Sequence, residues 1–175
     1  EMIKLLRGAG ASMNLVNIDE QLFSAAAHGN GEKVSFLLLE DIQDELKNRA
    51  LLAAAQHGHE HVVKLLVGAG AQVDFRDQDG KSALMHAAMN GGFEVANMLV
   101  AAGAQLDFQD NPLRMTALMH AAAKDDAELV RFLLHAGANK ELTDKRSRTA
   151  LKIARSNKNT ALVEIFHTYD QAKEL

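Results

Sequence analysis

The sequence contains no cysteine and no tryptophan, and it has one proline and one tyrosine. Without cysteine there is no disulfide, no thiolate nucleophile and no cysteine-ligated zinc or iron–sulfur site. This absence favours a reducing intracellular compartment, cytoplasmic or nuclear. The single proline, Pro112, excludes a proline-rich linker. Because aromatic residues are also few, the apolar content is mostly Ala, Leu, Val and Met, which suits close packing of helices.

Long hydrophobic runs are missing too. The longest apolar stretches, such as Val95–Ala104, fall far short of the roughly 18 residues that a membrane span needs. The first residues do not develop the apolar region of a signal peptide. A net charge of −4 argues against a general nucleic-acid binder. We therefore expect a folded chain without a membrane span.

Motifs for catalysis or nucleotide binding are likewise absent. The sequence lacks the glycine-rich phosphate loops, Gly-x-Ser-x-Gly and His-Glu-x-x-His. Paired carboxylates, such as Asp77 with Asp79, fall in segments that predict exposed turns. Residues 57–61 (His-Gly-His-Glu-His) are the strongest metal candidate, but Gly58 is placed to end a helix and no fixed tetrahedral set is evident. We expect no enzymatic activity, no cofactor and no metal.

The chain does contain an internal repeat. One marker is a leucine within an Ala-rich segment, at Leu51, Leu84, Leu118 and Leu151. These leucines are 33, 34 and 33 residues apart. A second marker is a Gly-Ala pair, which begins at Gly70, Gly103 and Gly137. Two independent markers with one period indicate a stack of similar structural units.

Each unit predicts two helices. The first is short and Ala-rich, and Gly58 or Gly91 just beyond it can take the left-handed conformation that ends a helix. The second carries large apolar residues three or four positions apart, as at 62–66, which places them on one helix face. About ten polar residues then lead to the next unit, enough for a hairpin loop. Neither helix can bury its apolar face alone, so stacked neighbours must complete the core.

This pattern resembles the ankyrin repeat. The resemblance rests on the period, on Thr-Ala-Leu-x-x-Ala-Ala at 116–122, on the turn glycine and on the Gly-Ala ending, and it covers nearly the whole chain. It implies an all-α solenoid of stacked helix-turn-helix units with hairpin loops and negligible sheet. The family's Thr-Pro-Leu-His appears here without its histidine, which stands one place later at His86 and His120. The hydrogen bonds that the family draws from that histidine therefore do not carry over directly.

We divide residues 1–175 into a single array of units. The expected units are a partial repeat at 1–15, a short irregular repeat at 16–43, repeats at 44–76, 77–109 and 110–143, and a capping repeat at 144–175. The irregular repeat lacks Gly-Ala, which predicts a short turn in place of a hairpin. The repeat at 110–143 has one inserted residue, and Asp125 stands where its turn glycine would be. In the partial repeat, Leu5 and Leu6 predict contact with a further unit upstream, so we expect a longer protein.

The resemblance also implies a function. In ankyrin-type stacks the hairpin tips and first helices line a concave face on which partners dock, so we expect a monomeric domain with a protein or peptide partner. Carried over residue by residue, the expected contacts are Phe75, Gln78, Asp79, Lys81, Met89, Asn90, Phe108, Asn111, Leu113, Arg114, Met115, Lys124, Lys145, Arg146 and Arg148.

Two further patterns bear on binding. Leu15, Phe75, Phe108 and Leu142 share one hairpin place, and they form either an apolar stripe for a partner or packing between neighbouring hairpins. Charge is polarised, with a net −5 over residues 16–47 and +5 over residues 140–158. This is either a solvated surface or a field that steers an elongated partner. The alternative function is binding of nucleic acid or anionic lipid by the basic C-terminal unit, which would weaken steeply with salt.

Overall fold

The computed structural model describes residues 18–173, which form helical pairs joined by loops. The helices of this region are α2 (Ile18–Ala27), α3 (Gly31–Leu37), α4 (Asp44–Gln56), α5 (Glu60–Gly68), α6 (Ala83–Asn90), α7 (Phe93–Ala101), α8 (Ala117–Ala123), α9 (Ala127–His135), α10 (Ala150–Ser156) and α11 (Thr160–Lys173). Within it, β pairing is limited to one isolated bridge between Arg76 and Ser82. The predicted all-α solenoid is confirmed. The partial repeat at 1–15, with Leu5, Leu6 and Leu15, lies outside the described residues.

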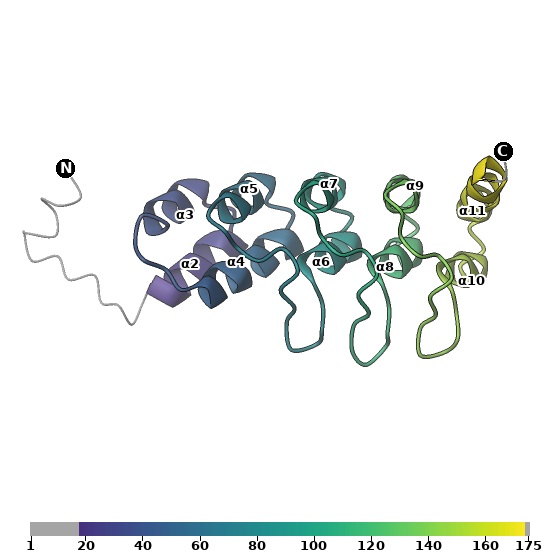
Figure 1. The fold of residues 1–175 in the computed structure, drawn as a ribbon, viewed down its shortest axis with the longest axis horizontal. Coiled ribbons are helices and arrows are strands. Elements are labelled where there is room, and N and C mark those ends of the chain that lie inside the picture. Colours follow the sequence, from purple (N-terminus) through teal and green to yellow (C-terminus); the bar gives the residue numbers. More distant parts are fainter. Residues whose placement is uncertain (1–17, 174–175) are drawn as a thin grey trace, which may run out of the picture.

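The helices form two rows (Figure 1). The inner row contains α2, α4, α6, α8 and α10, and the outer row contains α3, α5, α7, α9 and α11. Each inner helix contacts the next inner helix along the row and the outer helix that follows it. Three hairpin loops, here called finger 1 (residues 69–82), finger 2 (102–116) and finger 3 (136–149), extend beyond the inner row.

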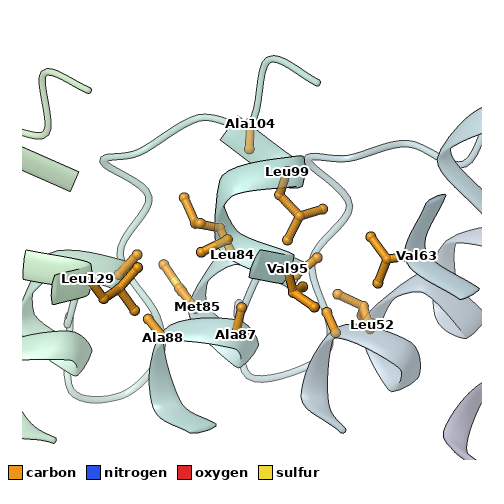
Figure 2. Packing of buried hydrophobic residues seen from close by; sticks show 14 of the residues in the cluster. Leu52, Val63, Leu84, Met85, Ala87, Ala88, Val95, Leu99, Ala104 and Leu129 are labelled. Atoms are coloured by element: carbon orange, nitrogen blue, oxygen red, sulfur yellow. The ribbon is translucent and has the colours of Figure 1, made fainter. Parts of the chain in front are cut away.

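The core lies between the two rows. Alanines such as Ala87 and Ala121 are fully buried on the inner helices, where small side chains let neighbouring helices approach closely. Leu66, Leu99 and Leu133 are fully buried on the outer helices, and each such side chain contributes about 1.5–3 kcal/mol relative to exposure. Figure 2 shows buried side chains from successive units meeting in this layer. Each unit therefore depends on its neighbours for a complete core.

Side-chain caps fix where the inner helices begin. The hydroxyl groups of Ser82, Thr116 and Thr149 accept hydrogen bonds from the backbone N–H three residues further on, at 3.3–3.4 Å. Such a cap stabilises a helix by about 1 kcal/mol. Because the three caps stand at the end of the three fingers, each finger is tied directly to an inner helix.

The predicted turn residues take left-handed backbone angles. Between the inner and outer helix of each unit, φ lies between 57° and 72° at Gly29, Gly58, Gly91, Asp125 and Lys158. The prediction for Gly58 and Gly91 is confirmed, and Asp125 adopts the same conformation in the place of a glycine. The turn geometry is thus set by the repeat and is kept even where the side chain opposes it.

The first two units are joined without a finger, as the missing Gly-Ala pair predicts. Helix α3 ends at Leu37, and α4 begins at Asp44 and runs for 13 residues. Its first turns occupy the place where a finger would reach the inner row. Buried Asn48 on this extension accepts the backbone N–H of Gln72 at 2.6 Å. Aspartates at 74 and 107 make the equivalent bond to the unit that follows them.

Candidate partner-binding face

We define the loop face as the exposed side of the inner helices together with the three fingers. An aspartate organises the base of each finger. In finger 1, Asp77 accepts the backbone N–H groups of Asp79 and Lys81 at 2.9 Å, and its other oxygen lies 2.8 Å from His86 Nε2. Burial raises the pKa of Asp77, but the hydrogen bonds from Lys81 and His86 outweigh it and the net pKa is lowered. The displaced histidine thus retains a structural hydrogen bond.

Finger 2 repeats this arrangement at greater depth. Asp110, only 2% exposed, accepts the Met115 N–H at 2.7 Å and lies 2.9 Å from His120 Nε2. Burial lowers the pKa of His120, and the contact with Asp110 opposes this without cancelling it. The ring is therefore held in its neutral form more strongly than a free histidine.

Finger 3 has no such histidine, because Ile153 stands in its place. The guanidinium of Arg148 replaces it and donates to Asp144 at 2.9 Å from Nε and 2.7 Å from Nη2. Burial raises the pKa of Asp144, but the hydrogen bonds from the Arg148 backbone and side chain outweigh this effect, and the net pKa is lowered. Each of the three fingers is thus held by its own buried or half-buried aspartate, and the side chain that pairs with this aspartate differs between the fingers.

The fingers are also bonded to one another. The backbone N–H of Asn111 donates to Asp79 O at 2.7 Å, and that of Lys145 donates to Leu113 O at 2.8 Å. The side-chain amide of Gln109 adds a bond to the carbonyl of finger 3 at residue 143, at 2.8 Å. The tips therefore form one continuous row, and little ordering entropy is lost when a partner contacts them.

The shared apolar hairpin place is half-buried. Phe75, Phe108 and Leu142 pack against the core without being enclosed by it. The guanidinium of Arg76, from finger 1, lies 4.7 Å from the centre of the Phe108 ring in finger 2. The described part of the stripe thus combines the two interpretations, since each side chain packs on a neighbour and keeps part of its surface open.

A hollow of about 560 Å³ opens beside finger 1, between that finger and helices α2 and α4. Its lining is Phe23, Glu45, Arg49, Leu52, Ala53, Gln56, Phe75, Arg76, Asp77, Gln78, Asp79 and His86. Phe23 is 46% exposed, and the guanidinium of Arg49 lies 5.9 Å from its ring centre. The hollow lies where the missing finger would pass, so it follows from the short connection before α4.

Most of the predicted contact residues lie open on the loop face. The exposed ones are Gln78, Asp79, Asn90, Asn111, Leu113, Arg114, Lys124, Lys145 and Arg146. Five others are half-buried: Phe75, Lys81, Met89, Phe108 and Arg148. Lys81 is paired with Asp79 at 2.7 Å, and the amide of Asn90 donates to Gln56 O at 2.8 Å.

The expectation of an exposed Met115 is wrong. Met115 is only 7% exposed and belongs to the core. It occupies the finger place held by Lys81 and Arg148 in the other fingers, whose charged ends reach the surface. A thioether gains by turning inward, because burial removes its apolar surface from water.

Residue-by-residue carry-over missed the N-terminal part of the loop face. Phe23, Glu45, Arg49 and Gln56 line the hollow but were not among the expected contacts. A signal was present, because the spacing from Leu37 to Leu65 is only 28 residues and no Gly-Ala pair lies between the first two units. That spacing indicates a missing finger, and a missing finger exposes the helices on either side of it.

The histidines at 57–61 have structural surroundings. His59 Nε2 lies 2.9 Å from Ala27 O of the preceding unit. Across residues 18–173, no three histidine, aspartate or glutamate side chains are grouped to hold a metal ion. Nor does any helix in that range combine the length and apolar character that crossing a membrane requires.

The two rows of helices and the tied fingers define a helical repeat protein built from stacked units. A family model described as ankyrin repeats in three copies matches residues 22–110 and 102–173. The chain belongs to the ankyrin repeat family, whose repeats generally mediate protein–protein interactions and are typically not enzymes.

One relative is a transient receptor potential cation channel subfamily A member 1 homolog from Caenorhabditis elegans. It is 39% identical over 84 residues, which cover 44% of this chain and 7% of that protein. The chain is therefore similar to a small part of a much longer relative.

Proposed function

We propose that the loop face binds a protein or peptide partner, which lies across the fingers between Gln78 and Arg148. The bonds between neighbouring fingers support this most directly, since they hold the tips as one preorganised row. A preorganised surface retains more of its contact energy as affinity than a flexible one. The lack of cysteine is consistent with a partner in the cytoplasm or nucleus.

The residues offered to this partner combine apolar surface with charge. Leu113 is 49% exposed at the tip of finger 2, and Phe108 of the same finger is half-buried. Arg114 and Arg146 are exposed on fingers 2 and 3. Aromatic and arginine side chains are the types in which interface energy is usually concentrated.

The test begins with capture of partners by the full-length protein and their identification by mass spectrometry. Binding of a captured partner is then measured with Phe108→Ala and Arg146→Ala, each of which should weaken it about 30-fold, equivalent to about 2 kcal/mol. The matched controls are Lys64→Ala and Arg131→Ala, which remove exposed charges from the outer helices α5 and α9. If these controls weaken binding as much as the finger variants, the partner does not use the loop face.

The basic C-terminal unit offers a second candidate function. Five of its bases are exposed: Lys145, Arg146, Lys152, Arg155 and Lys158. Arg148 is instead neutralised by Asp144, and Lys140 by Asp170. Binding of duplex DNA or of vesicles containing anionic lipid would support this function if it fell steeply with salt.

A further inference from the structure

Fingers 2 and 3 each form a backbone hydrogen bond to the preceding finger, and finger 1 has no preceding finger within the described residues. Asn111 in finger 2 and Lys145 in finger 3 donate their backbone N–H to the finger before them. By the spacing of 33 and 34 residues, the equivalent residue in finger 1 is Gln78. Gln78 lines the hollow, on the side of finger 1 where a preceding finger would lie. Its N–H is therefore placed to donate to an added chain.

One cation–π contact joins fingers 1 and 2, and the aromatic ring of finger 1 has no equivalent partner in the part of the chain that the structure describes. Arg76 covers the ring of Phe108 from the preceding finger. Phe75 is the equivalent residue of finger 1, and its ring lines the hollow. Among residues 18–173, no arginine or lysine is stacked on Phe75. The ring thus presents a surface of the kind on which the neighbouring finger accepts a guanidinium.

The charges around the hollow favour a cation. Its two arginines already lie on aromatic rings, Arg49 on Phe23 and Arg76 on Phe108. Glu45 is exposed on the first turn of α4 and forms no salt bridge within the described residues. A carboxylate and an open aromatic ring that line the same hollow suit a planar guanidinium better than a compact ammonium.

We propose that the hollow holds an extended, arginine-bearing loop of the partner protein, which takes the place of the missing finger. A main-chain carbonyl of this loop accepts the Gln78 N–H, and its arginine stacks on Phe75 and pairs with Glu45. Such a loop would be one binding mode within the loop face. The inference rests on the proposed function, because it takes the partner to be a protein.

A peptide that copies finger 1 is the probe, because finger 1 is the segment that packs on finger 2. A fluorescein-labelled peptide copying residues 71–81 carries the arginine and the carbonyl that finger 1 offers to finger 2. Fluorescence anisotropy with the full chain should give saturable binding. A peptide with glutamine in place of that arginine should bind at least about fivefold more weakly, because it loses both the stacking and the charge pair.

Variants of the protein locate the binding. Glu45→Gln and Phe75→Ala should each weaken binding of the peptide by about five- to tenfold. The matched control Glu60→Gln, which removes an exposed carboxylate from the first turn of the outer helix α5, should leave binding unchanged. Glu45 is exposed, so its substitution tests the proposal even if Phe75→Ala disturbs finger 1. A loss caused by Phe108→Ala alone would overturn the proposal, because the peptide would then be displacing finger 1.

Three other outcomes also overturn it. They are no saturation at about 1 mM peptide, equal binding of the arginine and glutamine peptides, and insensitivity to both Glu45→Gln and Phe75→Ala. None of them bears on the proposed function, which is decided separately by Phe108, Arg146 and the outer-helix controls with a captured partner. The two proposals can therefore fail independently.

Discussion

His120 is the histidine partner of Asp110 at the base of finger 2. Its ring is buried beside Asp110, whose carboxylate also fixes the backbone at Met115. Burial opposes a positive charge on the ring, which is why its pKa is lowered in the folded chain. Protonation of His120 therefore acts against folding, although an aspartate lies within hydrogen-bond distance.

We predict that His120 makes the fold sensitive to mild acid. Since its folded pKa lies below the unfolded value of 6.5, the stability it contributes is complete above that pH. It is lost as pH falls from there toward the folded pKa, because the unfolded chain then binds the proton more readily. His120→Gln should reduce the fall in the urea midpoint between about pH 7.5 and 5.5.

The exposed His28 serves as the matched control, and His28→Gln should keep the wild-type pH dependence. An unchanged slope in His120→Gln would show that the buried ring does not couple folding to pH.

At the scale of the elements, the turn between inner and outer helix keeps left-handed backbone angles even at residues that do not favour them. Asp125 and Lys158 take left-handed angles that glycine adopts at the other units. Asp125 is partly compensated, since its carboxylate accepts the side-chain amide of Asn159 at 3.1 Å. Lys158 is exposed, and its backbone N–H donates to Arg155 O, the same bond that Gly29, Gly58 and Asp125 form to the residue three places earlier.

We predict that Lys158→Gly stabilises the protein by about 0.5–1 kcal/mol. Glycine removes the cost of about 1–2 kcal/mol for a left-handed residue, and its larger unfolded-state entropy offsets part of the gain. The reverse change, Gly58→Ala, should cost about 1 kcal/mol through φ alone, because its Cβ would meet no atom within 4 Å. Urea unfolding at neutral pH measures both changes.

Asp125→Gly separates backbone strain from side-chain bonding. It relieves the same angle but loses the bond to Asn159, so it should gain less than Lys158→Gly. A larger gain at Asp125 would contradict this account.

At the scale of the whole molecule, the protein is a one-dimensional stack in which each inner helix packs mainly on the adjacent inner helices and on the outer helix that follows it. Helices α8 and α9 have a unit on either side, whereas α10 and α11 end the array within the described residues. Lys152 and Arg155 of this last unit are exposed.

We predict that stability falls toward the C-terminal end of this stack. In this 175-residue chain, amide hydrogens of α10 should exchange about tenfold faster than those of α8, because α8 packs on both α6 and α10 whereas α10 packs on α8 as its inner neighbour. A tenfold ratio corresponds to about 1.4 kcal/mol. Hydrogen–deuterium exchange followed by mass spectrometry measures this directly. Equal protection of the two helices would show that the stack unfolds only as a whole.

The amino-acid sequence by itself determined the helical pairs, the period and the left-handed turns. These features are local or repeat at fixed spacing, so Leu51, Leu84 and the glycines predict them without any knowledge of the tertiary contacts. The sequence also indicated that the first connection lacks a finger, because its spacing is short and its Gly-Ala pair is missing.

Only the tertiary structure decided which side chains reach the surface of the loop face. Met115 shares a finger place with Lys81 and Arg148, yet it turns into the core while their charged ends stay out. The hollow between Phe23 and Phe75 likewise depends on how α2, α4 and finger 1 pack together. Burial and cavity shape arise from contacts between distant segments, and a repeating pattern does not contain those contacts where the repeat is broken.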